Sequence, residues 1–390
     1  MSITAPAGFS ASGIACGIKA SGAPDLALVV TSDGKPVPAA GVFTTNKAAA
    51  APVQVSRAHL QETGGRASGV IINSGNANAA TGAQGKRHAW GMAAAVAHEL
   101  GIESKAILVC STGLIGIPLQ FEPIQSGIGE LVGRLGSDIG NAQQAARAIL
   151  TTDTRAKQSE FRDNGFIIGG MAKGAAMLEP SMATMLAVLT TDAVATSEML
   201  HCALQEAVAS SFNQLIIDGA TSTNDTVLVF ASGASGHKVD EASLVVGLKT
   251  VCTDLAYQMA NDAEGGTKVA RITVKGAMDS VEALAGARKV ASSLLVKCSL
   301  NGQDPYWGRI VSELGSAGID FDIDLVSVSY GGVRVCSEGS AAPHDAAKVQ
   351  LHMSGHDIDI EADLGLGDGE ASVLATDISH AYIDENVRTS

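Results

Sequence analysis

Aromatic residues are scarce in this chain, at 4% of 390 residues, and positive charge is scarcer than negative. With 26 lysines and arginines against 40 aspartates and glutamates, the net charge is −14, and no basic run stands out. Such a surface repels phosphate groups, so we expect neither a nucleic-acid partner nor binding to an anionic membrane. The core must be mostly aliphatic, and the 44 glycines allow close backbone approaches.

Long apolar runs and paired cysteines are missing as well. No apolar stretch approaches about 18 residues, and the N-terminal MSITAPAGFSASG has no basic and apolar segments, so we expect neither a membrane span nor a signal peptide. The six cysteines form no CxxC pair, which is typical of reduced thiols, although a catalytic cysteine stays an alternative. The histidines show no metal-ligand spacing. We therefore expect a cytoplasmic protein without a metal.

Short apolar runs rich in β-branched residues alternate with helical patterns. Bounded by Gly, Asn, Ser and Thr, these runs predict buried strands at 26–30, 70–73, 107–110, 166–168, 185–189 and 227–230. Apolar spacing predicts helices over 90–100, over 200–208 after a cap at Thr196, and from 244 to an end at Gly265–Gly266. The sequence therefore predicts a mixed α/β chain in which helices cover sheets.

The C-terminal part carries a different pattern. Residues 357–361 alternate polar and apolar, which is typical of a half-exposed strand. The glycine-rich segment 365–369 lacks a buried strand before it and a helix after it, so we interpret it as a hairpin turn rather than a dinucleotide-binding loop. We place a smaller C-terminal domain over 285–390, after a main domain over 1–284.

The segment GGMAKGAAMLEPSMATML at 169–186 is the sharpest candidate for chemistry. One interpretation is structural, a glycine-rich loop before a buried strand that begins with Thr184. The other is catalytic, because Ala183 is small and leaves its carbonyl open to attack by the Thr184 hydroxyl. Water cleaves the resulting ester, and the freed α-amine of Thr184 becomes the base for its own hydroxyl. Lys173 can hold a substrate carboxylate or, as a desolvated amine, assist proton transfer.

Four polar segments are further candidates, each with an ordinary structural alternative. Residues 110–116, CSTGLIG, follow an apolar strand and can either stabilise an oxyanion or form a turn. Glu264, in NDAEGGTK, lies at a predicted helix end where a carboxylate is unfavourable, so it either binds an ammonium group or pairs with Lys268. The segments 73–78 and 222–226 either line a polar pocket or form Asx turns.

Together these segments resemble one family, the glutamate N-acetyltransferases or ornithine acetyltransferases of arginine biosynthesis. The resemblance extends from about residue 7 to the C-terminus, and the stretch at 169–193 is its most specific part. The motifs that carry it are GIKASGAPDLALV at 17–29, NSGNANAATG at 73–82, CSTGLIG at 110–116, TTDT at 151–154, GGMAKGAAMLEPSMATMLAVLTTDA at 169–193, DGATSTNDT at 218–226, DAEGGTK at 262–268, DPYWGR at 304–309 and DEN at 384–386.

The resemblance implies a fold and a processing step. Within an α/β (α+β) chain, we expect an αββα-like main domain with stacked sheets between helices, followed by the smaller C-terminal α/β domain. Self-cleavage between Ala183 and Thr184 would give an α chain, 1–183, and a β chain, 184–390. The two chains are expected to stay associated as an α2β2 heterotetramer.

The resemblance also implies a ping-pong reaction. N-acetylornithine acetylates Thr184 and ornithine leaves, and glutamate then takes the acetyl group to become N-acetylglutamate. No bound cofactor is implied, but some members of the family also use acetyl-CoA as donor, and no residue set in the sequence separates the two kinds. The residues that match the family's site are Thr112 and Gly113 for an oxyanion hole, Lys173 and Glu264 for substrate binding, Thr151 (preferred over Thr152) for a further contact, and Asn386 and Ser390 for closure of the site.

The chain departs from the family pattern in three places. Tyr306 replaces an Asn, Ala80 replaces a common Cys, and the tail after Asn386 is one residue shorter and lacks a Tyr, which weakens the match at Ser390. Two other functions stay open. One is a related self-cleaving amidase or aminopeptidase, in which water accepts the acyl group. The other is a catalytically silent sensor of acylated amino acids.

Overall fold

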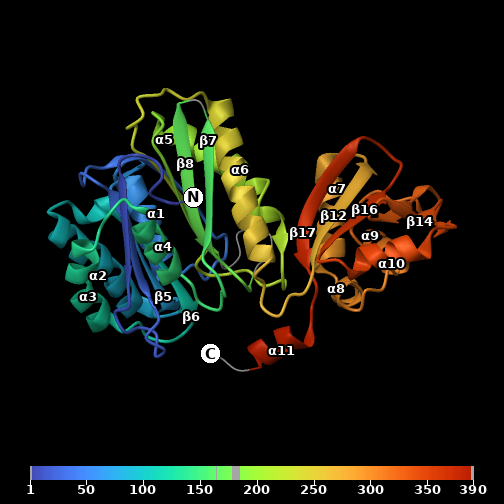
Figure 1. The fold of residues 1–390 in the computed structure, drawn as a ribbon, viewed down its shortest axis with the longest axis horizontal. Coiled ribbons are helices and arrows are strands. Elements are labelled where there is room, and N and C mark those ends of the chain that lie inside the picture. The colour runs from blue at the N-terminus through green and yellow to red at the C-terminus, as the bar shows by residue number, and fades with distance from the viewer. Residues whose placement is uncertain (1, 164, 178–184, 388–390) are drawn as a thin grey trace. The chain divides into compact units, whose positions relative to one another are not determined.

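The computed structural model describes residues 2–163, 165–177 and 185–387. Their contacts divide the chain into two compact units (Figure 1), one made of 2–213 and 220–259 and the other of 214–219 and 260–387. The boundary expected after residue 284 falls inside the second unit. The second unit begins before residue 284 because strand β12 (Val269–Ala277) pairs with two other strands of that unit and carries helix α7 on its face.

Two sheets form the centre of the first unit. The four-stranded sheet has the order β1-β2-β5-β6, and the six-stranded sheet has the order β4-β3-β11-β9-β8-β7. Pairing is antiparallel except between β5 and β6 and between β9 and β11. The strands are β1 Phe9–Ile14, β2 Leu26–Thr31, β3 Val37–Phe43, β4 Arg66–Ala67, β5 Gly69–Asn76, β6 Ile107–Leu114, β7 Lys157–Asp163, β8 Phe166–Lys173, β9 Leu186–Thr191 and β11 Thr226–Ala231.

Helices cover the outer faces of both sheets, with α2 and α3 beside β5 and with α6 beside β7 and β8 in Figure 1. Alternate residues of the four-stranded sheet explain this layering. Leu28 and Ile71 pack toward the covering helices, whereas Val29 and Val70 pack into the core shared with the six-stranded sheet. The αββα-like arrangement is thereby confirmed. The helices are α1 Ala51–Glu62, α2 Gly82–Leu100, α3 Phe121–Gly133, α4 Ile139–Ala148, α5 Ser197–Ala209 and α6 Glu241–Ala260.

The six predicted buried strands are confirmed as β2, β5, β6, β8, β9 and β11, and the predicted helices as α2, α5 and α6. Thr196 caps α5, because its hydroxyl accepts a hydrogen bond from the amide of Met199 at 3.2 Å. Helix α6 ends at Ala260, before the expected Gly265–Gly266. Successive turns follow it, in which the Ala263 amide donates to Ala260 and the Gly266 amide donates to Ala263.

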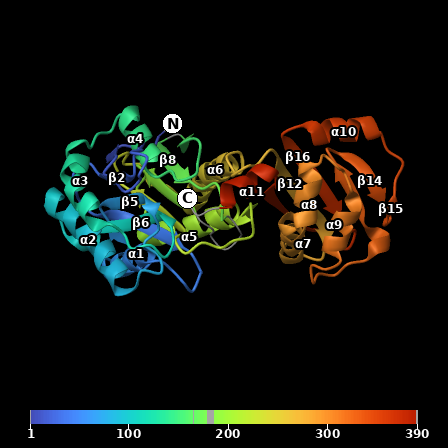
Figure 2. The ribbon, with the colours of Figure 1, turned by 90° about the horizontal axis from the view of Figure 1, so that it is seen from below.

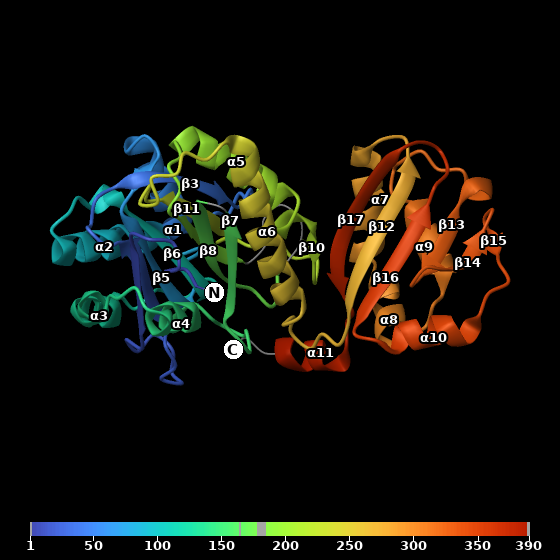
Figure 3. The ribbon, with the colours of Figure 1, turned by 45° about the horizontal axis from the view of Figure 1, so that its top comes forward.

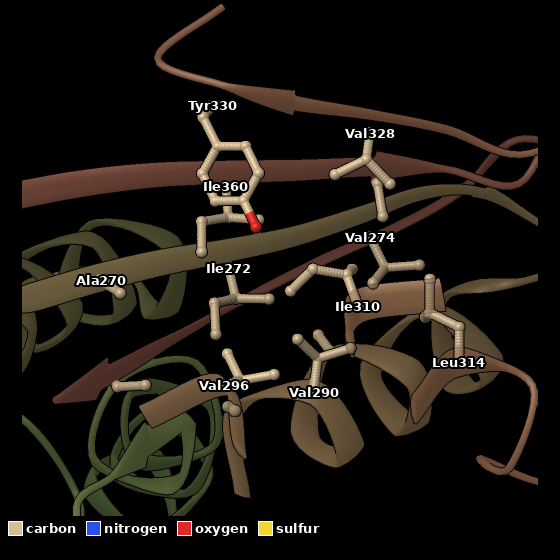
Figure 4. Close-up of a cluster of buried hydrophobic side chains, with 14 of the residues drawn as sticks. Ala270, Ile272, Val274, Val290, Val296, Ile310, Leu314, Val328, Tyr330 and Ile360 are labelled. Carbon is tan, nitrogen blue, oxygen red and sulfur yellow. The ribbon is translucent and has the colours of Figure 1, made fainter. Parts of the chain in front are cut away.

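The second unit holds a seven-stranded sheet of order β10-β17-β12-β16-β13-β14-β15 (Figure 3). Helices α7, α8 and α9 lie together on it (Figure 2), and their apolar side chains meet those of the sheet in the core drawn in Figure 4. The elements are β10 Leu215–Ile216, β12 Val269–Ala277, α7 Ser280–Ser292, α8 Leu294–Asn301, α9 Trp307–Leu314, β13 Ser327–Tyr330, β14 Val333–Ser337, β15 Ser340–Ala341, α10 Ala346–Ser354, β16 Asp357–Asp363, β17 Gly369–Thr376 and α11 His380–Asn386.

The expected strand at 357–361 is confirmed as β16, but the hairpin expected at 365–369 is wrong. Strands β16 and β17 are not neighbours, because β12 lies between them, parallel to β16 and antiparallel to β17. The connecting loop instead crosses the end of β12, where the carbonyl of Gly276 accepts hydrogen bonds from the amides of Leu366 and Gly367. Within the described parts of the chain, no helix is long and apolar enough to span a membrane.

Candidate active site

Lys173 ends strand β8 in the first unit, and its side chain is almost fully buried. Its Nζ donates hydrogen bonds to Oγ1 of Thr151 at 2.7 Å and to Oγ1 of Thr112 at 3.2 Å. One buried ammonium therefore joins three segments that are far apart in the sequence. A buried cation beside two hydroxyls is the type of group that binds a carboxylate.

Asp153 supplies the negative charge that lets a lysine be buried here. Its Oδ1 accepts hydrogen bonds from Nζ of the buried Lys157 at 2.6 Å and from the amide of Gly174 at 2.7 Å, and its Oδ2 lies 3.8 Å from Nζ of Lys173. Burial alone would raise the pKa of Asp153, but Lys173, Lys157 and the Gly174 amide outweigh it and lower the pKa to about 2. The carboxylate thus stays charged at neutral pH.

A second lysine approaches the same segment. Nζ of Lys19 donates to the carbonyls of Leu150 and Pro24, each at 2.7 Å. Burial lowers the pKa of Lys19, and the positive charge of Lys173 lowers it further, against opposing effects of Asp25 and Asp153. This positive charge lies beside Thr151 and adds to the local attraction for anions.

Thr112 and Gly113 lie near the end of β6, which pairs in parallel with β5. Gly113 has φ +131°, and a Cβ at this position would lie 2.3 Å from the carbonyl carbon of Gly75 and 2.5 Å from the amide nitrogen of Asn76. Only glycine fits here, because the two backbones are in direct contact. The close approach fixes the peptide between Thr112 and Gly113, which is what a preorganised oxyanion site requires.

The side chains of segment 222–226 contact the backbone just after β5, on β6 and just before β9. Nδ2 of Asn224 donates to the carbonyls of Ala77 at 2.6 Å and Ser111 at 2.8 Å, while Oδ1 of Asp225 accepts from the amide of Met185 at 2.8 Å. Burial raises the pKa of Asp225 well above its usual range, although the Met185 amide, Lys173 and Ser222 oppose the shift. The segment also contains a turn, in which the Asn224 amide donates to Oγ of Ser222 at 3.0 Å.

The cysteine next to this site does not provide a nucleophile at neutral pH. Cys110 lies two residues before Thr112 and is 3% exposed. Burial raises the pKa of its thiol to about 12, so the thiolate that would attack a carbonyl is not formed. All six cysteines are free thiols.

The structure brings four of the predicted site residues together, namely Thr112, Gly113, Thr151 and Lys173. It also distinguishes the two threonines of the TTDT motif, because the half-buried Thr151 contacts Lys173 whereas Thr152 is exposed. The predicted cleavage pair, Ala183 and Thr184, and the predicted tail residue Ser390 lie outside the described residues. Their roles stay predictions.

Glu264 and Asn386 belong to the second unit and contact each other. Nδ2 of Asn386 donates to Oε2 of Glu264 at 2.9 Å and to the carbonyl of Tyr382 at 2.9 Å. The alternative pairing of Glu264 with Lys268 is wrong, because Nζ of Lys268 instead donates to the carbonyls of Ser354 at 3.2 Å and Gly355 at 2.6 Å. Within the described residues, Glu264 is therefore held by an amide and not by Lys268.

Helix α11 holds Asn386 in place. Oγ of Ser379 accepts hydrogen bonds from the amides of Ala381 and Tyr382 and donates to the carbonyl of Gly265 at 2.5 Å, which ties the helix to the Glu264 loop. Burial raises the pKa of Tyr382 to about 12, and the charges of Asp218 and Glu264 contribute. The Tyr382 hydroxyl donates to Oδ2 of Asp218 at 3.4 Å, so a ligand with an ammonium group would find compensating negative charge here.

The sequence does not single out three polar residues that the structure buries in the first unit, namely Asp153, Asn224 and Asp225. Each belongs to a motif that was recognised, TTDT or DGATSTNDT. The available signal was the position of an ionisable or amide side chain beside a predicted buried strand. Residue type alone did not separate a long-range contact from a local Asx turn, since both use the same side chains.

Several known proteins are similar to this chain over most of its length. The ArgJ family model matches residues 10–389. The arginine biosynthesis bifunctional protein ArgJ of Mycolicibacterium paratuberculosis is 49% identical over 98% of this chain and 95% of its own length, and that of Thermobifida fusca is 45% identical over 99% of both. A solved structure of ornithine acetyltransferase from Mycobacterium tuberculosis, complexed with ornithine, is 42% identical over 47% of this chain and 95% of its own, with a TM-score of 0.44.

Proposed function

Because this chain belongs to the ArgJ family, we propose that it transfers an acetyl group from N-acetylornithine to glutamate through an acetyl ester on Thr184. The observation that carries the proposal is the buried ammonium of Lys173 against the hydroxyls of Thr112 and Thr151, beside Gly113 with its φ of +131°. This arrangement offers a carboxylate anchor and an oxyanion site within one cluster.

The proposed first half-reaction breaks the amide bond of N-acetylornithine. The α-amine of Thr184 takes the proton of its own hydroxyl, and the oxygen attacks the acetyl carbonyl. The negative charge that develops on the carbonyl oxygen is stabilised beside Thr112 and Gly113. When the carbon–nitrogen bond breaks, the proton passes to the departing amine, and ornithine leaves an acetyl ester behind.

The second half-reaction reverses these steps with a different amine. The amino group of glutamate attacks the ester carbonyl, its proton returns to the Thr184 oxygen, and N-acetylglutamate leaves. Both substrates carry an α-carboxylate, so we assign Lys173 to that group in both half-reactions, with Thr151 as a further contact. Glu264, supported by Asn386, is assigned to the side-chain ammonium of ornithine, and Ser390 to closure of the site.

The nucleophile requires a processing step before any transfer. We propose that Thr184 attacks the carbonyl of Ala183, that the peptide bond shifts to an ester, and that water releases chains 1–183 and 184–390. The two chains would remain together, as α2β2, in the cytoplasm. No bound cofactor or metal takes part in this scheme.

The decisive experiment examines the purified protein on a denaturing gel and sequences the N-terminus of each band. We expect two polypeptides, the second beginning at Thr184. Thr184→Ala should stay a single chain and transfer no acetyl group, whereas Thr184→Ser, which retains a hydroxyl, should still cleave. A wild-type protein that remains one chain and transfers acetyl at full rate would refute the mechanism.

Two further measurements define the acceptor and the donor. Acetate released from N-acetylornithine without glutamate, at a rate equal to transfer, would favour the self-cleaving amidase. A bound acylated amino acid with no acetyl-enzyme would favour the sensor. Because the curated relatives are named bifunctional, we extend the proposal to acetyl-CoA as a second donor, and release of free thiol in the presence of glutamate tests it.

A further inference from the structure

Asn224 joins the two sheets of the first unit at the candidate site. Its side chain is 3% exposed, and Nδ2 donates to the carbonyl of Ser111 at 2.8 Å and to that of Ala77 at 2.6 Å. Ser111 directly precedes Thr112 on β6, in the four-stranded sheet, whereas Asn224 leads into β11 of the six-stranded sheet. A directional contact therefore crosses from one sheet to the other beside the proposed oxyanion pair.

Asp225, the next residue, holds the backbone that follows the proposed nucleophile. Asp225 is fully buried, and its Oδ1 accepts from the amide of Met185 at 2.8 Å. The amide of Thr226 donates to the carbonyl of Met185 at 3.2 Å, in line with the parallel pairing of Thr226 and Leu186. Both polar groups of the Met185 backbone are thus held from the 225–226 segment, and Met185 is covalently bonded to Thr184.

We propose that Asn224 and Asp225 are positioning residues that hold the nucleophile in register with the oxyanion site. The proposal rests on the proposed function, because it takes Thr184 as the nucleophile and Thr112 with Gly113 as the oxyanion donors. Asn224 binds Ser111, which precedes Thr112, and Asp225 binds Met185, which follows Thr184. Because Asn224 and Asp225 are adjacent in the chain, the peptide between them sets the distance between Ser111 and Met185.

A directional connection matters because most of the contact between the sheets, away from the Lys173–Thr112 hydrogen bond, is made by apolar side chains. The shared core consists of side chains such as Val70, Leu108, Val188 and Leu228, and their attraction is largely non-directional. Hydrogen bonds with a fixed length and angle determine register where packing does not. A displacement of about 1 Å between reacting groups can cost about a hundredfold in rate.

Asp225 acts in this scheme as a neutral acceptor. Its Oδ2 is buried, and within the described part of the chain it accepts no well-formed hydrogen bond. Burial also raises the pKa of the carboxyl well above its usual range, so the protonated acid is favoured. A protonated carboxyl and a carboxamide have nearly the same shape, and each offers one carbonyl oxygen. Asparagine can therefore replace the contact to Met185, whereas alanine cannot.

The test compares Asn224→Ala, Asp225→Ala and Asp225→Asn with the wild-type enzyme. Self-cleavage is followed on denaturing gels after expression, kcat and KM are measured on the cleaved fraction, and melting temperature is recorded. The matched control is Asn46→Ala, since Nδ2 of Asn46 also donates to a carbonyl of this region, that of Thr221 at 3.1 Å, without reaching Ser111 or Met185.

We expect both alanine variants at 224 and 225 to slow self-cleavage at least about tenfold and to lower kcat similarly, with KM for glutamate within about threefold of wild type. Asp225→Asn should retain cleavage and kcat within about threefold, and Asn46→Ala should match the wild type. The proposal is overturned if Asp225→Asn is as impaired as Asp225→Ala while melting normally, because a proton or charge role would then be required.

The proposal is also overturned if the two alanine variants cleave and turn over normally. It is overturned as well if their losses in cleavage rate and kcat are accompanied by proportionate changes in melting temperature and KM. Where an alanine variant does not fold, the cleavage rate and kcat of Asp225→Asn relative to those of the wild type decide. Failure of the proposed function has a different signature, since the wild-type chain itself would then remain uncleaved in the same experiment.

Discussion

The ammonium of Lys173 lies 3.2 Å from the hydroxyl of Thr112, at the point where β8 of the six-stranded sheet meets β6 of the four-stranded sheet. The two residues are 61 positions apart in the sequence. Neither strand contains the site alone, and the contact exists only because the two sheets stack on each other. This relationship places the proposed carboxylate anchor beside the proposed oxyanion pair.

Replacement of Lys173 by Met tests the anchor. The apolar chain keeps most of the volume but removes the charge, so both substrates lose a charge-assisted contact of about 1.5–3 kcal/mol, or roughly 10- to 150-fold in kcat/KM. Steady-state kinetics with each substrate varied would measure the loss. Lys35→Met, at an exposed lysine, is the control. Equal kcat/KM values for Lys173→Met and wild type would remove Lys173 from substrate binding.

The close approach at Gly113 predicts a sharp difference between two glycines of the same segment. Gly113→Ala would press its Cβ onto the backbone of Gly75 and Asn76 and should lower the free energy of unfolding by about 2–4 kcal/mol, with loss of acetyl transfer. Gly116 also has a positive φ, +81°, but a Cβ there has open space. Gly116→Ala should therefore cost only about 1 kcal/mol. Urea unfolding of both variants, with the transfer assay, gives the comparison, and equal losses would contradict it.

The low pKa of Asp153 makes it a source of acid sensitivity. A folded-state pKa of about 2, below the unfolded value of about 3.9, contributes about 2 kcal/mol of stability above pH 4, which is lost as the pH falls toward 2. Asp153→Asn should therefore be less stable than wild type at pH 7, and the difference should narrow between pH 5 and pH 2.5. Chemical unfolding at several pH values measures this.

The control for this experiment is Asp33→Asn, because Asp33 forms an exposed pair with Lys35. That variant should differ little from wild type at any pH. A stability gap for Asp153→Asn that stays constant from pH 7 to pH 2.5 would show that the carboxylate charge contributes nothing through the two lysines.

The contact between Glu264 and Asn386 predicts a selective effect on one substrate. Glu264→Gln retains an oxygen that accepts from Asn386 but removes the negative charge. KM for N-acetylornithine should rise about tenfold, whereas KM for glutamate, which has no side-chain ammonium, should change less than about threefold. Measuring both constants on the same preparation tests the assignment, and parallel increases would argue against it.

The strands were predictable from short apolar runs, and β2, β5, β6, β8, β9 and β11 all followed from that signal. The pairing of strands was less predictable. The loop at 365–369 has the composition of a hairpin, but β12 enters the sheet between β16 and β17 from far away in the chain. Local composition indicates where a strand ends, and it contains no information about which strand becomes its neighbour.

The sequence by itself determined the strands and helices, the family and the candidate residues, because periodicity and motifs are local properties of the chain. Only the tertiary structure decided which of those residues meet. It selected Thr151 over Thr152 as the neighbour of Lys173, paired Glu264 with Asn386 rather than Lys268, and brought Asn224 and Asp225 into contact with Ser111 and Met185. These contacts depend on how the sheets stack. A buried polar side chain finds its hydrogen-bond partner only after segments that are distant in the sequence have packed together.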